Sequence, residues 1–192
     1  NTSQVGGRYN SQVAYRFRAT ESSALRSIGI YIIGDADPGY AGGNGGTLRI
    51  TVRRDDGTRK HRPSSVVLAT RDVAHPTTGA HNTYSFPDPA KLKKGRLYHI
   101  VFTNIDPSPR SNFVSLDGLF VFDERSRWQP AFSNTDWANL TRHDGGAWSS
   151  YRGRDEGTIT PIMQLNYANG KRAGVGYMEI WVRSPRIISG DH

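Results

Sequence analysis

The chain has 192 residues with 21 glycines, 10 prolines and no cysteine, and it carries a formal net charge of +8. This length suits one large β domain, which buries roughly 70% of the surface of its unfolded chain. The lack of cysteine excludes disulfides and thiolate metal sites, and no apolar run approaches the ~20 residues of a membrane-spanning helix. We therefore expect a single domain over 1–192, with its core over about 12–183.

Much of the chain alternates between apolar and polar residues. Within 12–19, Val13, Tyr15 and Phe17 fall on one face and two arginines on the other, and 47–54 repeats the pattern. This period of two is typical of half-buried β-strands. Segments rich in glycine, proline and aspartate separate the runs and predict loops and tight turns. The strands predicted in chain order are 12–19, 25–33, 47–54, 65–70, 81–86, 96–104, 112–122, 158–167 and 176–183.

One segment, 134–140, is a candidate for a short helical turn, because Asn134 or Thr135 would cap it. No other helix is predicted, and no repeat of fixed period is present. Many antiparallel strands joined by long loops predict an all-β jelly-roll sandwich of two antiparallel sheets with nine or ten strands. An eight-stranded barrel is the alternative.

The segment 125–154 holds three of the four tryptophans and five arginines, with little hydrophobic periodicity. This pattern favours loops that present their side chains to a ligand. Flat rings pack on the apolar faces of sugars, and arginine binds carboxylates or sulfates. The alternative is that the rings fill the ends of the sandwich. The predicted ligand-binding residues are Arg127, Trp128, Trp137, Arg142, Trp148, Tyr151 and Arg152.

The positive charge favours an anionic partner, and an acidic polysaccharide suits both the charge and the rings. Single-stranded nucleic acid is a second candidate, because bases also stack on exposed rings. It ranks lower, since the arginines are spread along the chain and no recognition helix or basic arm is visible.

A metal site is predicted from the run Asp35-Ala36-Asp37-Pro38-Gly39, which has the opening of a calcium loop. The run lacks a third oxygen ligand and the distal glutamate of an EF-hand. Asp35 and Asp37 are therefore candidate ligands of one structural calcium ion, and a plain turn is the alternative.

Catalytic patterns are weaker than binding patterns. The six histidines accompany no G-x-S-x-G or H-E-x-x-H motif, and adjacent acids such as Asp123 and Glu124 point to opposite faces of a strand. A lyase would need a base such as His143 or Tyr151 beside an arginine. A polysaccharide lyase or hydrolase thus remains the alternative function, with no catalytic residue assigned. A structural or adhesive domain with a protein partner is a third hypothesis.

Several segments carry a family resemblance. They are GTLRITVRRDDGT with PSSVVLAT, KKGRLYHIVFTNIDPSPRSNFVSLDGLFV, QPAFSNTDWANL and TPIMQLNYANGKRAGVGYMEIWV. Together they resemble the non-catalytic β-sandwich domains appended to secreted bacterial polysaccharide-active proteins. The resemblance implies a carbohydrate-binding module, secreted or at the bacterial cell surface, within a larger multidomain protein. It assigns no ligand residue.

Overall fold

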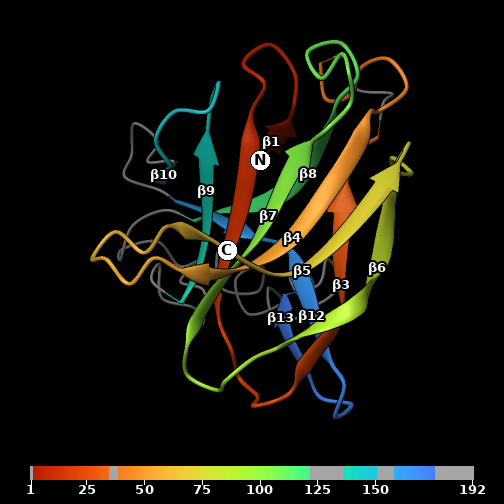
Figure 1. Ribbon diagram of the computed structural model, residues 1–192. Coiled ribbons are helices and arrows are strands. Elements are labelled where there is room, and N and C mark those ends of the chain that lie inside the picture. Colours follow the sequence, from red (N-terminus) through yellow and green to blue (C-terminus); the bar gives the residue numbers. More distant parts are fainter. Residues whose placement is uncertain (1, 35–38, 122–135, 151–157, 176–192) are drawn as a thin grey trace, which may run out of the picture.

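A computed structural model of the protein describes residues 2–34, 39–121, 136–150 and 158–175 (Figure 1). These residues form strands and no helix, and hence no helix that could cross a membrane. The strands are β1 (Thr2–Val5), β2 (Gln12–Arg18), β3 (Ala24–Ile32), β4 (Thr47–Asp55), β5 (Pro63–Ala74), β6 (Ala80–Lys91), β7 (Leu97–Asn104), β8 (Val114–Val121), β9 (Trp137–Arg142), β10 (Ser149–Ser150), β11 (Thr158–Pro161), β12 (Met163–Tyr167) and β13 (Arg172–Val175).

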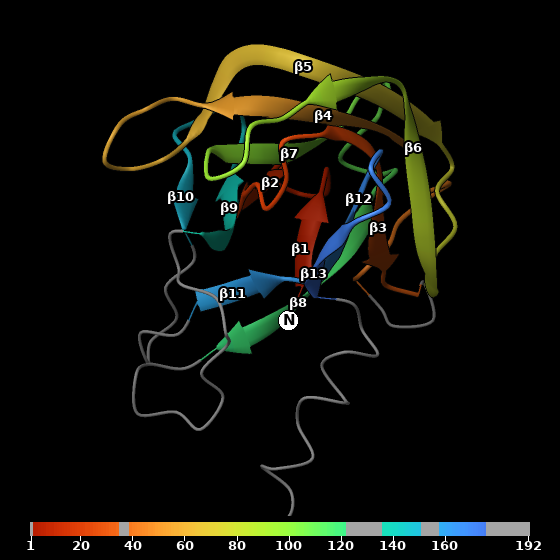
Figure 2. The same cartoon turned by 90° about the horizontal axis from the view of Figure 1, so that it is seen from below.

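The strands make two sheets that pack face to face, as the view from below shows (Figure 2). The six-stranded sheet has the order β10-β9-β2-β7-β4-β5. The seven-stranded sheet follows the path β1-β8-β3-β12-β13, with β6 beside β3 and β11 beside β8. From β2 to β9 the chain changes sheet at almost every step, which is typical of a jelly roll and not of a closed barrel. The predicted all-β sandwich of two antiparallel sheets is therefore confirmed.

The core lies between the two sheets and follows from the alternation of side chains. In β2, Val13, Tyr15 and Phe17 point inward and are at most 1% exposed, and Ile28 and Ile30 of β3 face them from the other sheet. Burying each large apolar side chain contributes about 1.5–3 kcal/mol. Because a shift of one residue would turn this set toward water, the core fixes the register of β2. It thereby fixes which residues β2 presents on its outer face.

The helical turn predicted over 134–140 is wrong for the described residues. Trp137 to Arg142 form strand β9, which pairs with β2 from Phe17↔Trp137 to Gln12↔Arg142. Pairing with an existing strand outweighs the local capping signal, since it hydrogen-bonds every second residue of β9 to β2 and buries Trp137. The two predicted cap residues, Asn134 and Thr135, lie outside the described residues.

The structure has more strands than the nine or ten expected. The short strands β1, β10 and β13 were not predicted, and the single strand predicted over 158–167 is divided at Ile162. Its first part, β11, pairs with β8, and its second part, β12, pairs with β3. Conversely, β5 and β6 are longer than predicted, at 12 residues each. The strand predicted over 176–183 lies outside the described residues.

Candidate functional site

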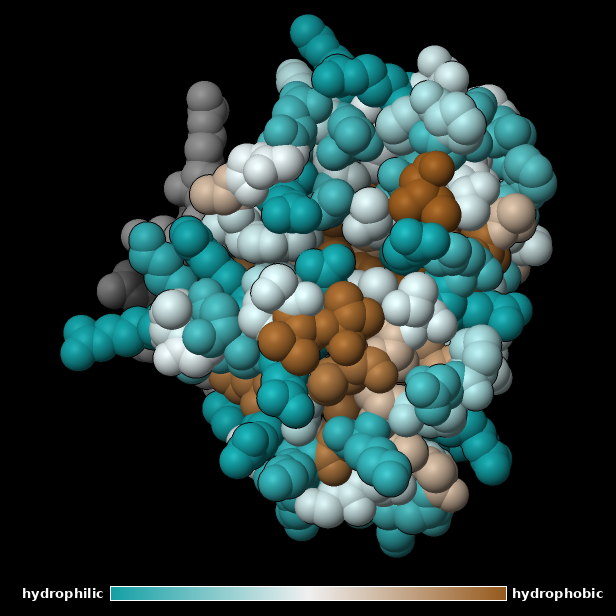
Figure 3. All heavy atoms as spheres, in the orientation of Figure 1, coloured by the Kyte–Doolittle hydropathy of each residue, from teal (hydrophilic) through white to brown (hydrophobic). Residues whose placement is uncertain are grey.

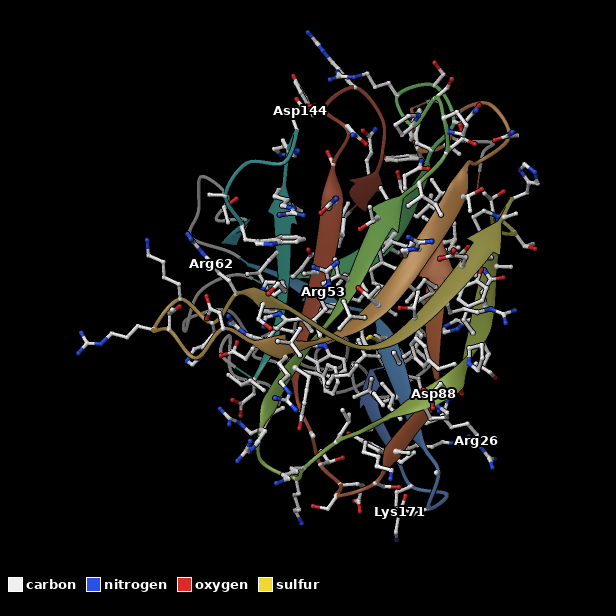
Figure 4. All side chains as sticks on the ribbon, in the orientation of Figure 1. Arg26, Arg53, Arg62, Asp88, Asp144 and Lys171 are labelled. Carbon is white, nitrogen blue, oxygen red and sulfur yellow. The ribbon has the colours of Figure 1, made fainter. Side chains whose placement is uncertain are left out.

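The outer face of the six-stranded sheet is the candidate site. Across this face the register places Arg16 of β2 beside His99 of β7, and His99 beside Arg53 of β4. Figure 4 shows Arg53 near the middle of the face and Arg62 on the β4–β5 connection to its left. Three strands that are distant in sequence thus bring a row of cationic and titratable side chains together.

Asp55, at the end of β4, binds two histidines at once. His99 Nε2 lies 2.9 Å from Asp55 Oδ1, and His61 Nδ1 lies 3.0 Å from Asp55 Oδ2. Because a carboxylate only accepts hydrogen bonds, both ring nitrogens act as donors. The same carboxylate accepts the backbone N–H of Gly57 at 3.0 Å. These bonds hold the start of the β4–β5 connection, residues 56–62, against the sheet.

His99 is fully buried, and its Nδ1 has no hydrogen-bond partner among the described residues. Protonation would create a buried N–H group without an acceptor, so the neutral ring is favoured. Burial lowers the pKa of His99 from 6.5 to about 4, although the hydrogen bond and the negative charge of Asp55 act in the opposite direction. His99 is therefore neutral at physiological pH and serves as a fixed hydrogen-bond donor to Asp55.

Arg16 on β2 also binds the β4–β5 connection. Arg16 Nη1 donates to the carbonyl oxygen of His61 at 2.9 Å. Arg16 itself is only 9% exposed. Burial lowers the pKa of Arg16, and the negative charges of Asp55 and Asp136 oppose that effect. The guanidinium stays charged, since an arginine pKa lies far above 7. Arg16 and Asp55 together anchor residues 56–62 over one end of the outer face.

Two further arginines on this face are oriented by uncharged partners, and one of them lies over a tryptophan. The guanidinium carbon of Arg142 is 4.8 Å from the centre of the Trp148 ring, which is a cation–π contact. Arg142 Nε donates to the side chain of Gln12 at 2.5 Å, and Arg53 Nε donates to Thr51 Oγ1 at 3.0 Å. Each arginine is therefore held in one orientation by a neutral partner.

Among the described residues, Arg53 and Arg142 differ from Arg49 and Arg18, which form ion pairs with carboxylates. Arg49 binds Asp72 through two nitrogens, at 2.8 and 2.7 Å, and Arg18 binds Asp136 at 2.8 Å. Neither Arg53 nor Arg142 forms an ion pair with a carboxylate in the described part of the chain. Burial lowers the pKa of Arg53, and the positive charge of Arg142 lowers it further. Two half-buried cations that repel each other make a local site for an anion.

The face also carries apolar surface. Figure 3 shows an apolar area in its middle, surrounded by hydrophilic residues. Strand β5 crosses there, and Val66 and Val67 on β5 are each 45% exposed. In the β4–β5 ladder Val67 pairs with Arg53. An apolar area next to a cation suits a ligand that has both apolar faces and negative charges, as an acidic sugar does.

Two of the predicted site residues, Arg142 and Trp148, are brought together. Trp148 is only 7% exposed, because it packs on Ala14, Val101, Ala138 and Leu140 on the outer face and lies under Arg142. Its ring is therefore not an open stacking surface. In this arrangement the ring contacts the guanidinium of Arg142.

Trp137 requires a correction, because it belongs to the core between the sheets and does not lie on a rim. It is 5% exposed, and its Nε1 donates to the backbone oxygen of Pro161 at 2.7 Å. Its ring lies against Gly174 of β13, where a Cβ atom would be 2.8 Å from the ring and where φ is +108°. Trp137 and Trp148 therefore lie on opposite faces of the sheet, since they face different sets of neighbours.

The remaining predicted residues lie outside the described residues. They are Arg127, Trp128, Tyr151 and Arg152 for the ligand and Asp35 and Asp37 for calcium. In the ranges that are described, no group of three or more histidine, cysteine, aspartate or glutamate side chains could hold a metal ion. A structural calcium ion at Asp35 and Asp37 stays a prediction.

Sequence reasoning did not predict Arg53, Asp55 and His61 as members of the candidate site. Alternation within 47–54 places Arg53 on the outward face, but nothing in the sequence distinguishes it from the ion-paired Arg49 on the same strand. The partner that decides between them, Asp72, is 23 residues from Arg49. In comparisons with known proteins, neither a family model nor a curated protein matches the chain.

Proposed function

We propose that this β-sandwich is a non-catalytic carbohydrate-binding module for anionic polysaccharide, with its site on the outer face of the six-stranded sheet. It would hold an attached enzyme or surface protein on its substrate, outside the cell or at the bacterial cell surface. The net charge of +8 and the sequence resemblance both support this function. Arg53 and Arg142 bind the carboxylates or sulfates of the chain.

One observation carries the proposal, namely the pair of cations Arg53 and Arg142 without a described carboxylate. Each is oriented by a neutral hydrogen bond, and Arg142 is also held by Trp148. Orienting both groups in advance lowers the entropy cost of binding. Neutral partners leave further N–H groups of each guanidinium available to an anion.

The test uses a matched pair of polymers, dextran sulfate and uncharged dextran, with affinity measured by gel retardation and calorimetry. The protein should bind dextran sulfate and not dextran, and salt should weaken the binding. Arg53→Gln should lower the affinity about tenfold or more, because a charge-assisted hydrogen bond contributes roughly 1.5–3 kcal/mol. A carboxylated dextran tests whether carboxylates and sulfates are interchangeable.

Arg49→Gln is the matched control, since it removes the same charge from the same face of the same strand. Arg49 already forms an ion pair with Asp72 and is therefore not available to a ligand. This variant should change the affinity less than about twofold. Arg26→Gln removes a charge at the lower right edge of the molecule, away from Arg53 (Figure 4). Equal losses in all three variants would mean nonspecific attraction and would contradict the proposal. Tighter binding of single-stranded DNA than of any glycan would favour nucleic acid instead.

The rival function, a polysaccharide lyase or hydrolase, has one observation in its favour. His61 is 33% exposed, and Asp55 holds its Nδ1. A histidine oriented by a carboxylate is the usual arrangement of a general base. Incubation with alginate, pectin, xanthan, hyaluronan and ulvan should yield no new unsaturated or reducing ends. If such ends formed and His61→Gln abolished them, the protein would be an enzyme.

A further inference from the structure

Tyr9 is the most exposed large hydrophobic side chain in the described residues. It is 49% exposed, and Val66, Val67 and Ile105 are the others that reach the surface to a similar degree. The loop 6–11 that carries Tyr9 connects β1 and β2. It lies at the end of the sheet where β9 ends, next to Asp144 in Figure 4. A single exposed ring is common on protein surfaces, so the case for a function rests on the surroundings of Tyr9.

The backbone around Tyr9 is held by neighbouring loops. The N–H of Asp144 donates to the oxygen of Tyr9 at 2.9 Å, and the guanidinium of Arg110 donates to the oxygen of Arg8. Gly7 N–H donates to the oxygen of Pro109 at 2.8 Å. At Gly6, where φ is +93°, a Cβ atom would lie 2.5 Å from the same Pro109 oxygen, so only glycine allows this close approach. The loop is thus fixed before any ligand arrives.

The surroundings of the ring are cationic and aromatic. The guanidinium carbon of Arg8 is 5.3 Å from the centre of the Tyr9 ring, and the His143 ring is 5.5 Å away at an angle of 57°. His143 Nδ1 lies 2.8 Å from Ser11 Oγ, which fixes the imidazole. A flat ring flanked by a cation offers the same combination of contacts for an acidic sugar as the arginine pair does.

The Tyr9 cluster is continuous with the arginine site. His143 directly follows Arg142, and Ser11 directly precedes Gln12, the residue that accepts from Arg142 Nε. The Tyr9 cluster therefore lies just beyond the end of β9 that carries Arg142. A polymer bound at Arg142 would reach Tyr9 as it leaves the sheet.

From this geometry we infer that Tyr9 and Arg8 form a second subsite for the same anionic polysaccharide. The ring stacks on the apolar face of one sugar, and Arg8 binds the carboxylate or sulfate of that sugar or its neighbour. This inference rests on the proposed function and deepens it, because it requires the ligand to be a chain of several sugars.

The test measures dextran sulfate affinity for Tyr9→Ala, Tyr9→Phe and Tyr31→Ala. Tyr9→Ala should weaken binding up to about tenfold, and Tyr9→Phe should bind as the wild type does, because it keeps the ring. Tyr31→Ala is the matched control. It also removes a ring packed on a histidine, His81 at 6.1 Å, but on the seven-stranded sheet. Its affinity should be unchanged.

Other outcomes distinguish a failure of the second subsite from a failure of the proposed function. Wild-type affinity in Tyr9→Ala, together with a loss in Arg53→Gln, would overturn the second subsite and leave the proposed function standing. Equal losses in Tyr9→Ala and Tyr9→Phe would show that the hydroxyl and not the ring is used, which also overturns the stacking role. A wild-type protein that binds no polyanion would overturn both. Thermal melts of each variant confirm that the fold is intact.

Discussion

The two faces of the six-stranded sheet use the same kinds of residue in opposite ways. On the inner face, Trp137 is enclosed between the sheets and gives its only ring N–H to Pro161. On the outer face, Trp148 lies on a small apolar cluster and carries the guanidinium of Arg142. The two rings are only 11 positions apart in the sequence. An aromatic-rich segment can therefore contain one residue that stabilises the core and another that contacts a cation on the outer face.

The largest effect that separates the two faces is expected for Trp137→Ala. Truncating a buried tryptophan leaves a cavity and an unpaired Pro161 oxygen, so the free energy of unfolding should fall by about 3–5 kcal/mol. Binding of dextran sulfate by the folded protein should be unchanged. Urea denaturation and calorimetry at a temperature where the variant is folded measure both quantities. Wild-type stability with lost binding would instead restore Trp137 as a ligand-binding residue.

The second prediction concerns the buried histidine on the outer face. Because folding lowers the pKa of His99 to about 4 and the unfolded chain has a value near 6.5, the unfolded state binds a proton first as the pH falls. The stability that the neutral ring contributes is fully present above pH 6.5 and is lost as the pH falls toward 4. At about pH 5 the loss should be roughly 2 kcal/mol.

Urea denaturation of wild type and His99→Gln at a series of pH values isolates this contribution. The variant should be less stable at neutral pH but should lose less stability on acidification, since its amide does not titrate. If wild type and His99→Gln had the same slope, the histidine would not be the group that titrates.

The sequence predicted the fold better than the site, for a physical reason. Alternation along β2, β4 and β7 is set by burial within each strand, so it is visible in a few consecutive residues. Whether an arginine has an ion-pair partner depends on the neighbouring strand, as the contrast between Arg49 and Arg53 shows. The burial of Trp137 likewise depends on β11 and β13, which follow it in the chain. Such contacts between distant segments cannot be read from the local pattern.

The smallest predicted effect tests whether Trp148 acts through Arg142 or touches the ligand itself. Trp148→Leu keeps apolar contact with Ala14 and Leu140 but removes the cation–π interaction, which contributes about 0.5–1 kcal/mol at partly exposed sites. Stability should fall by about that amount. Affinity for dextran sulfate should also fall, because Arg142 loses the surface that orients it, whereas Trp148→Phe should retain most of the affinity.

A double-mutant cycle with Arg142→Gln decides between the two roles. If Trp148 only positions Arg142, adding Trp148→Leu to Arg142→Gln should cause no further loss of affinity. Additive losses would mean that the ring contacts the sugar directly. Its exposed fraction of 7% argues for the positioning role, because a ring so enclosed by Arg142 and the sheet offers too little surface for stacking. The cycle therefore measures how far burial has converted a potential ligand platform into the support for a cation.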